Sequence, residues 1–240
     1  MTTSSYDYGL WFEVFYNLAF VLLFALSFLV PKRRVEWRSM GLFGAWLVAL
    51  FTEMFGFPLT IYALTALLGR AYPVLDPFSH KNGHLLVALA GGSETIWMAV
   101  MLFTMALFWA GIVVMAVGWR RVHRAQGALV TDGIYAWLRH PQYAGLFMVI
   151  VAFLIQWPTI PTLLMAPALF RTYIRLARRE EREMEERFGE AYRLYKTRVP
   201  GFIPRLDVWR MSRGGTRMLN RRWMPARGTI KGSSVDGGKE

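Results

Sequence analysis

Two polar groups bracket an apolar stretch of this chain and could hold a small charged ligand. The first is Arg-His-Pro-Gln-Tyr at 139–143, and the second is the pair Glu180-Glu181. Pro141 fits the first turn of a helix, where its missing N–H is no loss, so His140 is expected at the N-cap. The free amides and the positive helix end there favour an anion such as a carboxylate. Adjacent glutamates instead suit a cationic group or a ribose diol.

Each group also has a purely structural interpretation. Arg139 and His140 could anchor the chain at a membrane interface, with Tyr143 in an aromatic belt. Adjacent glutamates on a charged helix are usually solvated. At about 100° per residue, however, the pair falls near the apolar stripe of its helix, while three other acids fall on the far side: Glu183, Glu186 and Glu190. This sorting favours a pair of acids turned toward the protein.

The composition indicates an integral membrane protein. Of 240 residues 55% are apolar, and they form several runs of membrane-spanning length. The chain has no Cys, which excludes disulfides, Cys-zinc sites and thiol nucleophiles. Its four His are scattered and form no credible ligand set, so we expect no metal. His123 lies outside the 139–143 motif and is expected to tolerate replacement.

Five spans can be drawn, at about 11–30, 41–69, 95–118, 141–157 and 161–173. Pro58 is expected to kink the second span. The last two are short for a bilayer of ~30 Å and form a tight helical hairpin. A cytoplasmic amphipathic helix is expected over 174–198. The predicted fold is therefore an all-α integral membrane helical bundle.

The net charge of +12 follows a topological pattern. Lys and Arg gather after the first, third and fifth predicted spans, which is the positive-inside distribution. This places residues 31–40, 119–139 and 174–240 in the cytoplasm, and 1–10 and 70–94 outside. The charge then faces anionic lipid and requires no nucleic acid. We expect a prokaryotic inner membrane protein.

The predicted organisation has three parts. Residues 1–126 form three N-terminal transmembrane helices. Residues 127–204 form a catalytic and cofactor-binding segment with the hairpin and the amphipathic helix. Residues 205–240 are basic and aperiodic, and are expected to be a disordered, lipid-facing tail.

The second part resembles the isoprenylcysteine carboxyl methyltransferase and phospholipid methyltransferase superfamily of integral membrane, S-adenosylmethionine-dependent enzymes. The matching features are LVTDGIYAWLRHPQY at 129–143, the short hairpin, the Glu180-Glu181 pair, and FGEAYRLYKTRVP at 188–200. The resemblance covers about residues 127–204. It implies methyl transfer from S-adenosylmethionine to a small or lipophilic acceptor, without a metal.

The resemblance also implies roles for individual residues. Those of the two polar groups would line the cofactor pocket: Arg139, His140, Pro141, Tyr143, Glu180 and Glu181. Gly133 and Tyr135 would supply close backbone approach and ring packing. The Arg that precedes the Glu pair is linked with the acceptor in eukaryotic relatives. Arg175 is the candidate for that catalytic role, and Arg171 stays open.

Glu53 lies well inside the second predicted span. Acids within a membrane are costly, and by default they indicate function. Glu53 is therefore a second catalytic candidate, as part of an acceptor pocket. In the alternative interpretation it is protonated, or paired through Tyr62, Trp97 or Arg139.

Other functions stay open at this stage. Membrane sterol reductases share a similar motif but bind NADPH, and a non-catalytic membrane protein could keep the same fold. The Glu pair and the FGExY helix fit the methyltransferases better. The acceptor could be a prenylated-cysteine carboxylate, a thiol or a phospholipid amine.

Overall fold

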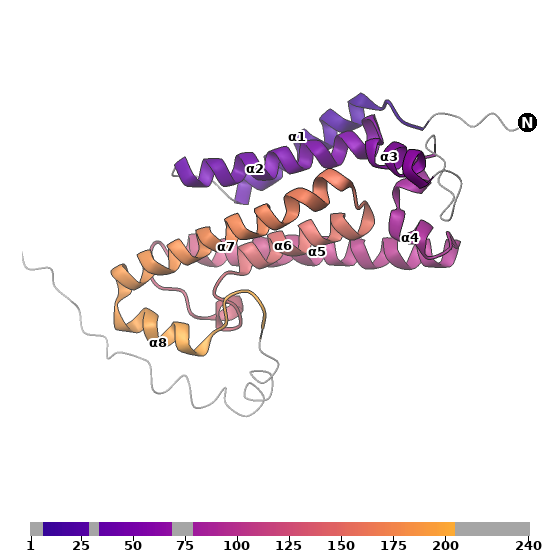
Figure 1. The fold of residues 1–240 in the computed structure, drawn as a ribbon. Helices are drawn as coiled ribbons and strands as arrows, with labels where there is room; N and C mark the ends of the chain where they lie inside the picture. The colour runs from indigo at the N-terminus through magenta and orange to yellow at the C-terminus, as the bar shows by residue number, and fades with distance from the viewer. Residues whose placement is uncertain (1–6, 29–33, 69–78, 205–240) are drawn as a thin grey trace, which may run out of the picture. The chain divides into compact units, whose positions relative to one another are not determined.

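The chain is all-α, as predicted. The computed structural model describes residues 7–28, 34–68 and 79–204, and no β-strand occurs in these ranges (Figure 1). The helices belong to one compact unit, Met1–Ile203. The predicted tail at 205–240 lies outside the described residues.

The second predicted span is broken, and its prediction as one continuous helix is wrong. α1 covers Trp11–Phe28 and α2 covers Arg34–Phe51; a π-helical turn, Thr52–Gly56, and α3, Leu59–Leu68, follow. Between the turn and α3, Phe57 is extended (φ −121°, ψ 114°), and its N–H bonds back to Thr52 O at 2.7 Å. A residue before proline is driven out of the α region, so Pro58 ends the helix and does not merely bend it.

The third predicted span is confirmed and is longer than expected. A 3₁₀ turn, His80–Gly83, and the short α4, Leu85–Leu89, lead to α5, Glu94–Arg124. Ser93 caps α5, because its hydroxyl accepts from the Ile96 N–H at 3.2 Å. Basic residues fill the last turn of α5, where the helix dipole favours them.

The hairpin is formed by α6, Pro141–Gln156, and α7, Ile160–Phe188. A capping box between Thr159 and Thr162 begins α7. The amphipathic helix expected over 174–198 is neither one helix nor separate from the fifth predicted span, because α7 runs through that span and continues only to Phe188. α7 ends at Gly189, whose φ of 56° suits glycine, and α8, Glu190–Arg198, follows.

Close packing holds these helices together. A Cβ on Gly145 of α6 would lie 2.5 Å from the Gly111 carbonyl oxygen of α5, so the two backbones touch. Trp46 of α2 donates to Thr162 O of α7 at 3.1 Å. Gly118 of α5 packs on Pro141, and Tyr143 donates to Glu180 of α7, so the start of α6 lies beside the C-terminal parts of α5 and α7. The predicted polar groups are brought together at this end.

The surface of the bundle suits a lipid environment. Two helices of the described ranges, Arg38–Gly56 and Glu94–Arg124, are long and apolar enough to cross a membrane. Large apolar side chains are exposed along α5 and α7, including Leu102 (65%), Trp109 (56%) and Leu164 (75%). An apolar surface of this extent requires an apolar surrounding, which a bilayer provides.

Candidate functional site

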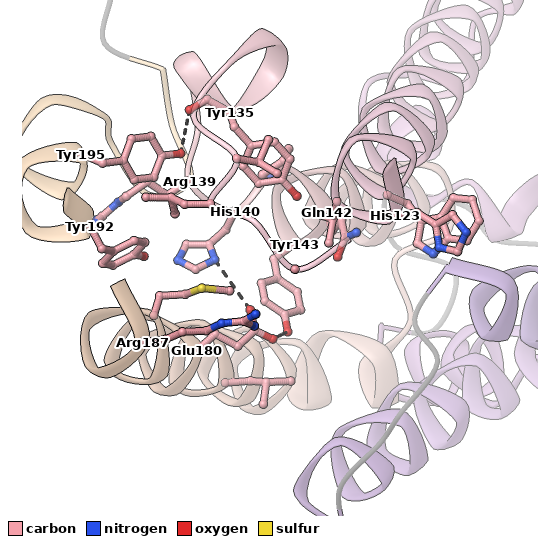
Figure 2. A pocket seen from close by; sticks show the side chains of 18 of the residues that line it. His123, Tyr135, Arg139, His140, Gln142, Tyr143, Glu180, Arg187, Tyr192 and Tyr195 are labelled. Atoms are coloured by element: carbon pink, nitrogen blue, oxygen red, sulfur yellow. Dashed lines mark hydrogen bonds and ion pairs between the residues drawn. The ribbon is translucent and has the colours of Figure 1, made fainter. Parts of the chain in front are cut away.

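A cavity of about 500 Å³ lies where α5 and α7 end and α6 begins, with α8 and the loop 127–140 as its other walls. This volume is in the range of small-molecule and cofactor sites. Figure 2 shows His140 between Tyr192 of α8 and Glu180 of α7. The polar and aromatic side chains of the lining come from several elements: Ser39, Trp119, His123, Tyr135, Arg139, His140, Gln142, Tyr143, Tyr173, Glu180, Arg187, Tyr192 and Tyr195.

Glu181 is the centre of an ion-pair network behind the cavity. Its Oε1 lies 3.0 Å from His140 Nε2 and 3.2 Å from Arg139 Nη1, and its Oε2 lies 3.1 Å from Lys196 Nζ. Burial alone would raise the pKa of this carboxyl. Hydrogen bonds from His140 and Lys196 and the charge of Arg139 outweigh it and lower the pKa to about 2. Glu181 therefore stays ionised and fixes its three partners.

Glu180 is the more open carboxylate of the pair. Its side chain is 41% exposed, against 11% for Glu181, and it forms part of the cavity wall. Tyr143 donates its hydroxyl proton to Glu180 Oε1, and His140 Nδ1 lies 4.0 Å from Oε2. The carboxylate of Glu180, held by Tyr143, is thus part of the wall that a cationic ligand in the cavity would face.

Arg139 brings the opposite charge to the same wall. Its side chain is only 14% exposed, yet Nε and Nη1 have no hydrogen-bond acceptor in the described part of the chain. Arg139 Nη1 is close enough to Glu181 to form an ion pair, but the geometry of this contact is not that of a hydrogen bond. Buried donors normally find acceptors. A carboxylate would supply two acceptors to a guanidinium, so the donor set fits an acidic ligand group.

The segment after α8 closes over the motif. Backbone hydrogen bonds join Arg139 N to Pro200 O (2.9 Å) and His140 N to Gly201 O (3.0 Å). The Phe202 ring stacks on His140, with 5.3 Å between centroids. This pairing fixes the backbone of the motif just before α6 begins.

The side chains on either side of this segment add further restraints. Tyr195 of α8 donates to Tyr135 O at 2.7 Å, and burial raises the pKa of Tyr195, which keeps its hydroxyl a donor. His140 occupies the N-cap position of α6 before Pro141, as predicted, but its side chain makes no cap hydrogen bond. The ring is directed to Glu181 instead.

The structure brings most of the predicted cofactor residues together. Six of them line the cavity or lie directly behind it, on α6, α7 and the loop before α6: Arg139, His140, Pro141, Tyr143, Glu180 and Glu181. Tyr135 lines it as well. Gly133 does not: it has a φ of 59°, and a Cβ there would lie 2.8 Å from the Arg121 guanidinium carbon. Its backbone approaches Arg121 at this turn, not the cavity.

The two candidates for catalysis lie elsewhere. Arg175 is exposed on α7 and is absent from the cavity wall, as is Arg171. Glu53 accepts hydrogen bonds from the N–H (2.9 Å) and hydroxyl (3.1 Å) of Thr60, not from the partners proposed for it. Thr60 in turn accepts from the Ile160 N–H at 3.0 Å. Glu53 therefore joins the broken helix to the start of α7, at the end of α7 away from the cavity.

Several lining residues were missed by the sequence analysis. His123 stacks on Trp119, with 4.9 Å between centroids and an interplanar angle of 11°, and both line the cavity. The expectation that His123 is a neutral position is therefore unsupported. The signal was the 119/123 spacing of one helical turn, overlooked because the span was ended at 118. Arg187 also lines the cavity, near the backbone of Gly127.

A family model and several curated proteins match part of this chain. The family model for phospholipid methyltransferases matches residues 95–191, which contain α5, α6, α7 and the 139–143 motif. The resemblance to the membrane methyltransferase superfamily is confirmed. No solved structure gave a significant match.

Three curated relatives carry one name. The protein-S-isoprenylcysteine O-methyltransferase of Schizosaccharomyces pombe is 36% identical over 77 residues, which are 32% of this chain and 33% of the relative. The proteins of that name from Mus musculus and Homo sapiens are each 36% identical over 77 residues, 27% of their length. The match thus spans a third or less of these relatives.

Within the described ranges, no group of three or more His, Asp or Glu side chains could hold a metal ion.

Proposed function

We propose that this chain is an integral membrane methyltransferase that uses S-adenosylmethionine. The observation that carries the proposal is the presence of opposite charges on one cavity wall: the carboxylate of Glu180, and the Arg139 donors that have no acceptor in the described part of the chain. S-adenosylmethionine has both a carboxylate and cationic groups, so it matches both sides. The family match and the names of the relatives support the reaction class.

Each residue of the wall has a role in this proposal. Arg139 receives the carboxylate of the cofactor, and Glu180 attracts a cationic group or accepts from the ribose. Glu181 acts through Arg139 and His140, which it holds in place, so it is a positioning residue. Tyr143 orients Glu180 by donating to it. Tyr135 contributes its ring to the wall.

The bound cofactor would supply an already activated methyl group on a sulfonium. The protein then mainly has to align donor and acceptor and exclude water. The aromatic lining from α5, α6 and α8 is suited to excluding water from the cavity. No catalytic role is proposed for Arg175 or Glu53, since neither lies on the cavity wall.

The acceptor is a small or lipophilic molecule. A thiol, a carboxylate or a phospholipid amine would each suit such a site, and the relatives are named for an isoprenylcysteine substrate. A lipophilic acceptor would reach the cavity from the bilayer, while the polar cofactor enters from the aqueous side.

The topology proposed with this function has five spans: α1, the broken α2–α3, α5, α6 and the first half of α7. The N-terminus is outside, and the cavity faces the cytoplasm of a prokaryotic cell. The distribution of Lys and Arg supports this orientation. Residues 127–204 supply most of the cavity wall in this arrangement, and α5 supplies the remainder with Ser39 and Met40.

An NADPH-dependent reductase fits the same cavity less well. The phosphates of NADPH need several cations or free backbone amides, whereas Glu180 places a negative charge on the wall.

Incubation with methyl-labelled S-adenosylmethionine and a total lipid extract tests the proposal. The wild-type protein and the Glu186→Gln variant, which changes an exposed acid, should produce a labelled lipid-soluble product. Glu180→Gln should produce much less. Absence of product from wild type with both lipid and small-thiol acceptors, or equal product from Glu180→Gln, would contradict it.

A further inference from the structure

One exposed face of α7 changes its chemistry along its length. Residues spaced three and four apart lie on one face of a helix, and on this face the first exposed residues are apolar: Ile160, Leu164 and Pro167. The next four at the same spacing are all exposed arginines, Arg171, Arg175, Arg178 and Arg182, which we call the α7 basic stripe. This change from apolar to basic residues indicates that α7 leaves the hydrocarbon layer of the membrane near Arg171.

α5 shows the same change at the same end of the bundle. Its exposed face carries Trp109, Val113 and Val117, followed at helical spacing by the exposed Arg120 and Arg124. α5 and α7 both end at the cavity, so their arginines lie toward one side of the membrane. Two helices with the same transition indicate one boundary between hydrocarbon and headgroups.

The α7 basic stripe does not serve the cavity. It lies about 170° around the helix from Glu180, which lines the cavity. It is also not neutralised by the protein: among the described residues none of its four arginines forms an ion pair, whereas Arg179, on another face, pairs with Glu183 at 3.4 Å. Four unpaired guanidinium groups in a row attract anions.

We propose that the α7 basic stripe binds the headgroups of anionic phospholipids. A guanidinium pairs with a phosphate through two parallel hydrogen bonds, and basic residues beside a hydrocarbon layer attract anionic lipid. From Arg171 to Arg178 the helix rises about 10 Å. The headgroup layer is about 5–8 Å thick in each leaflet. The long arginine side chains can bridge this difference, so that their guanidinium groups lie within the layer. The binding requires the membrane placement of α7 and is independent of methyl transfer.

The test measures lipid binding to the full-length protein in detergent by native mass spectrometry. The probes are phosphatidylglycerol, which is anionic, and phosphatidylcholine, which is not. Wild type should bind phosphatidylglycerol more tightly, and more salt should weaken that binding. Arg171→Gln with Arg175→Gln should weaken it about 25-fold, at about fivefold per arginine. Its phosphatidylcholine binding should not change.

The matched control is Arg179→Gln with Arg193→Gln, which removes the same charge from arginines that pair with Glu183 and Glu190. It should keep the lipid preference. Arg171→Lys with Arg175→Lys keeps the positive charges and should keep most of the preference for phosphatidylglycerol. If the Gln double variant does not fold, this Lys double variant is measured in its place. No preference in wild type, or equal loss in the Gln variant and the control, would overturn the proposal. If the stripe instead contacts an acidic protein, wild type should show no preference for phosphatidylglycerol.

Discussion

Glu180 and Glu181 are adjacent in the sequence but have different surroundings. Glu181 is held by Arg139 and Lys196 behind the cavity, while Glu180 is more exposed and forms part of the cavity wall. A ligand with a cationic group should therefore respond to Glu180 directly, and to Glu181 only through the residues that it holds. The two glutamates are expected to differ in what their replacement damages: binding for Glu180, stability for Glu181.

Glu181→Gln should lower the stability of the protein by about 1.5–3 kcal/mol near pH 7, the usual contribution of hydrogen bonds to a charged group. The folded state lowers the pKa of Glu181 from 4.5 to about 2. A lowered pKa stabilises the fold above the unfolded value and loses that effect as the pH falls through the folded value. The difference between wild type and variant should therefore shrink below about pH 5.

Thermal unfolding in detergent across this pH range provides the measurement. A difference that stays constant down to about pH 3 would show that the charge of Glu181 is not what holds Arg139, His140 and Lys196.

At the scale of elements, three glycines decide how the helices meet. Gly189 ends α7, so α8 can turn back toward the cavity, where Tyr192 and Tyr195 line the wall. Gly145 and Gly111 let α6 and α5 touch through their backbones. The second contact sets the spacing of the two helices whose ends form the cavity.

Gly145→Ala should destabilise the protein by about 1–3 kcal/mol, the usual cost of overpacking. The added methyl group would lie 2.5 Å from the Gly111 carbonyl oxygen, and a backbone atom cannot move aside cheaply. Gly41→Ala is the matched control, because a Cβ there has no neighbour within 4 Å and alanine favours helix. Thermal unfolding of both variants checks this. Equal melting temperatures would mean that α5 and α6 separate without cost.

The sequence predicted the elements near the cavity better than their boundaries. Pro141 is a local signal, so the start of α6 was predicted correctly. The continuity of α7 was not, because the change from apolar to charged residues near Tyr173 marks a change of surroundings, not the end of a helix. The break before Pro58 was expected only as a kink, since proline alone does not tell a bend from an interruption.

Local sequence motifs predicted only some of the residues that line the cavity. The 139–143 motif and the Glu pair could be found from their residues. The roles of Lys196 and of the 199–203 segment could not, because they depend on contacts across 15 to 61 residues of sequence. Glu53 was misleading for the same reason: its partner, Thr60, lies beyond the break that the sequence analysis treated as continuous helix.

For the whole molecule, the proposed orientation predicts which residues are accessible from outside the cell. Single cysteines give clean labelling because the chain has none of its own. A membrane-impermeant maleimide on intact cells should label Ala90→Cys, an exposed residue after α4, and spare Glu186→Cys, an exposed residue near the end of α7. Permeabilised cells should show both labelled. The reverse pattern in intact cells would place the cavity outside.

The claim that the cavity binds S-adenosylmethionine is tested most directly by calorimetry on the purified protein. Wild type should bind S-adenosylmethionine and not NADPH. Glu180→Gln should weaken the binding by about tenfold or more, as expected for a lost hydrogen bond to a charged group. Glu186→Gln, an exposed acid on the same helix, should bind like wild type. Preference for NADPH, or equal affinities in all three proteins, would contradict the account.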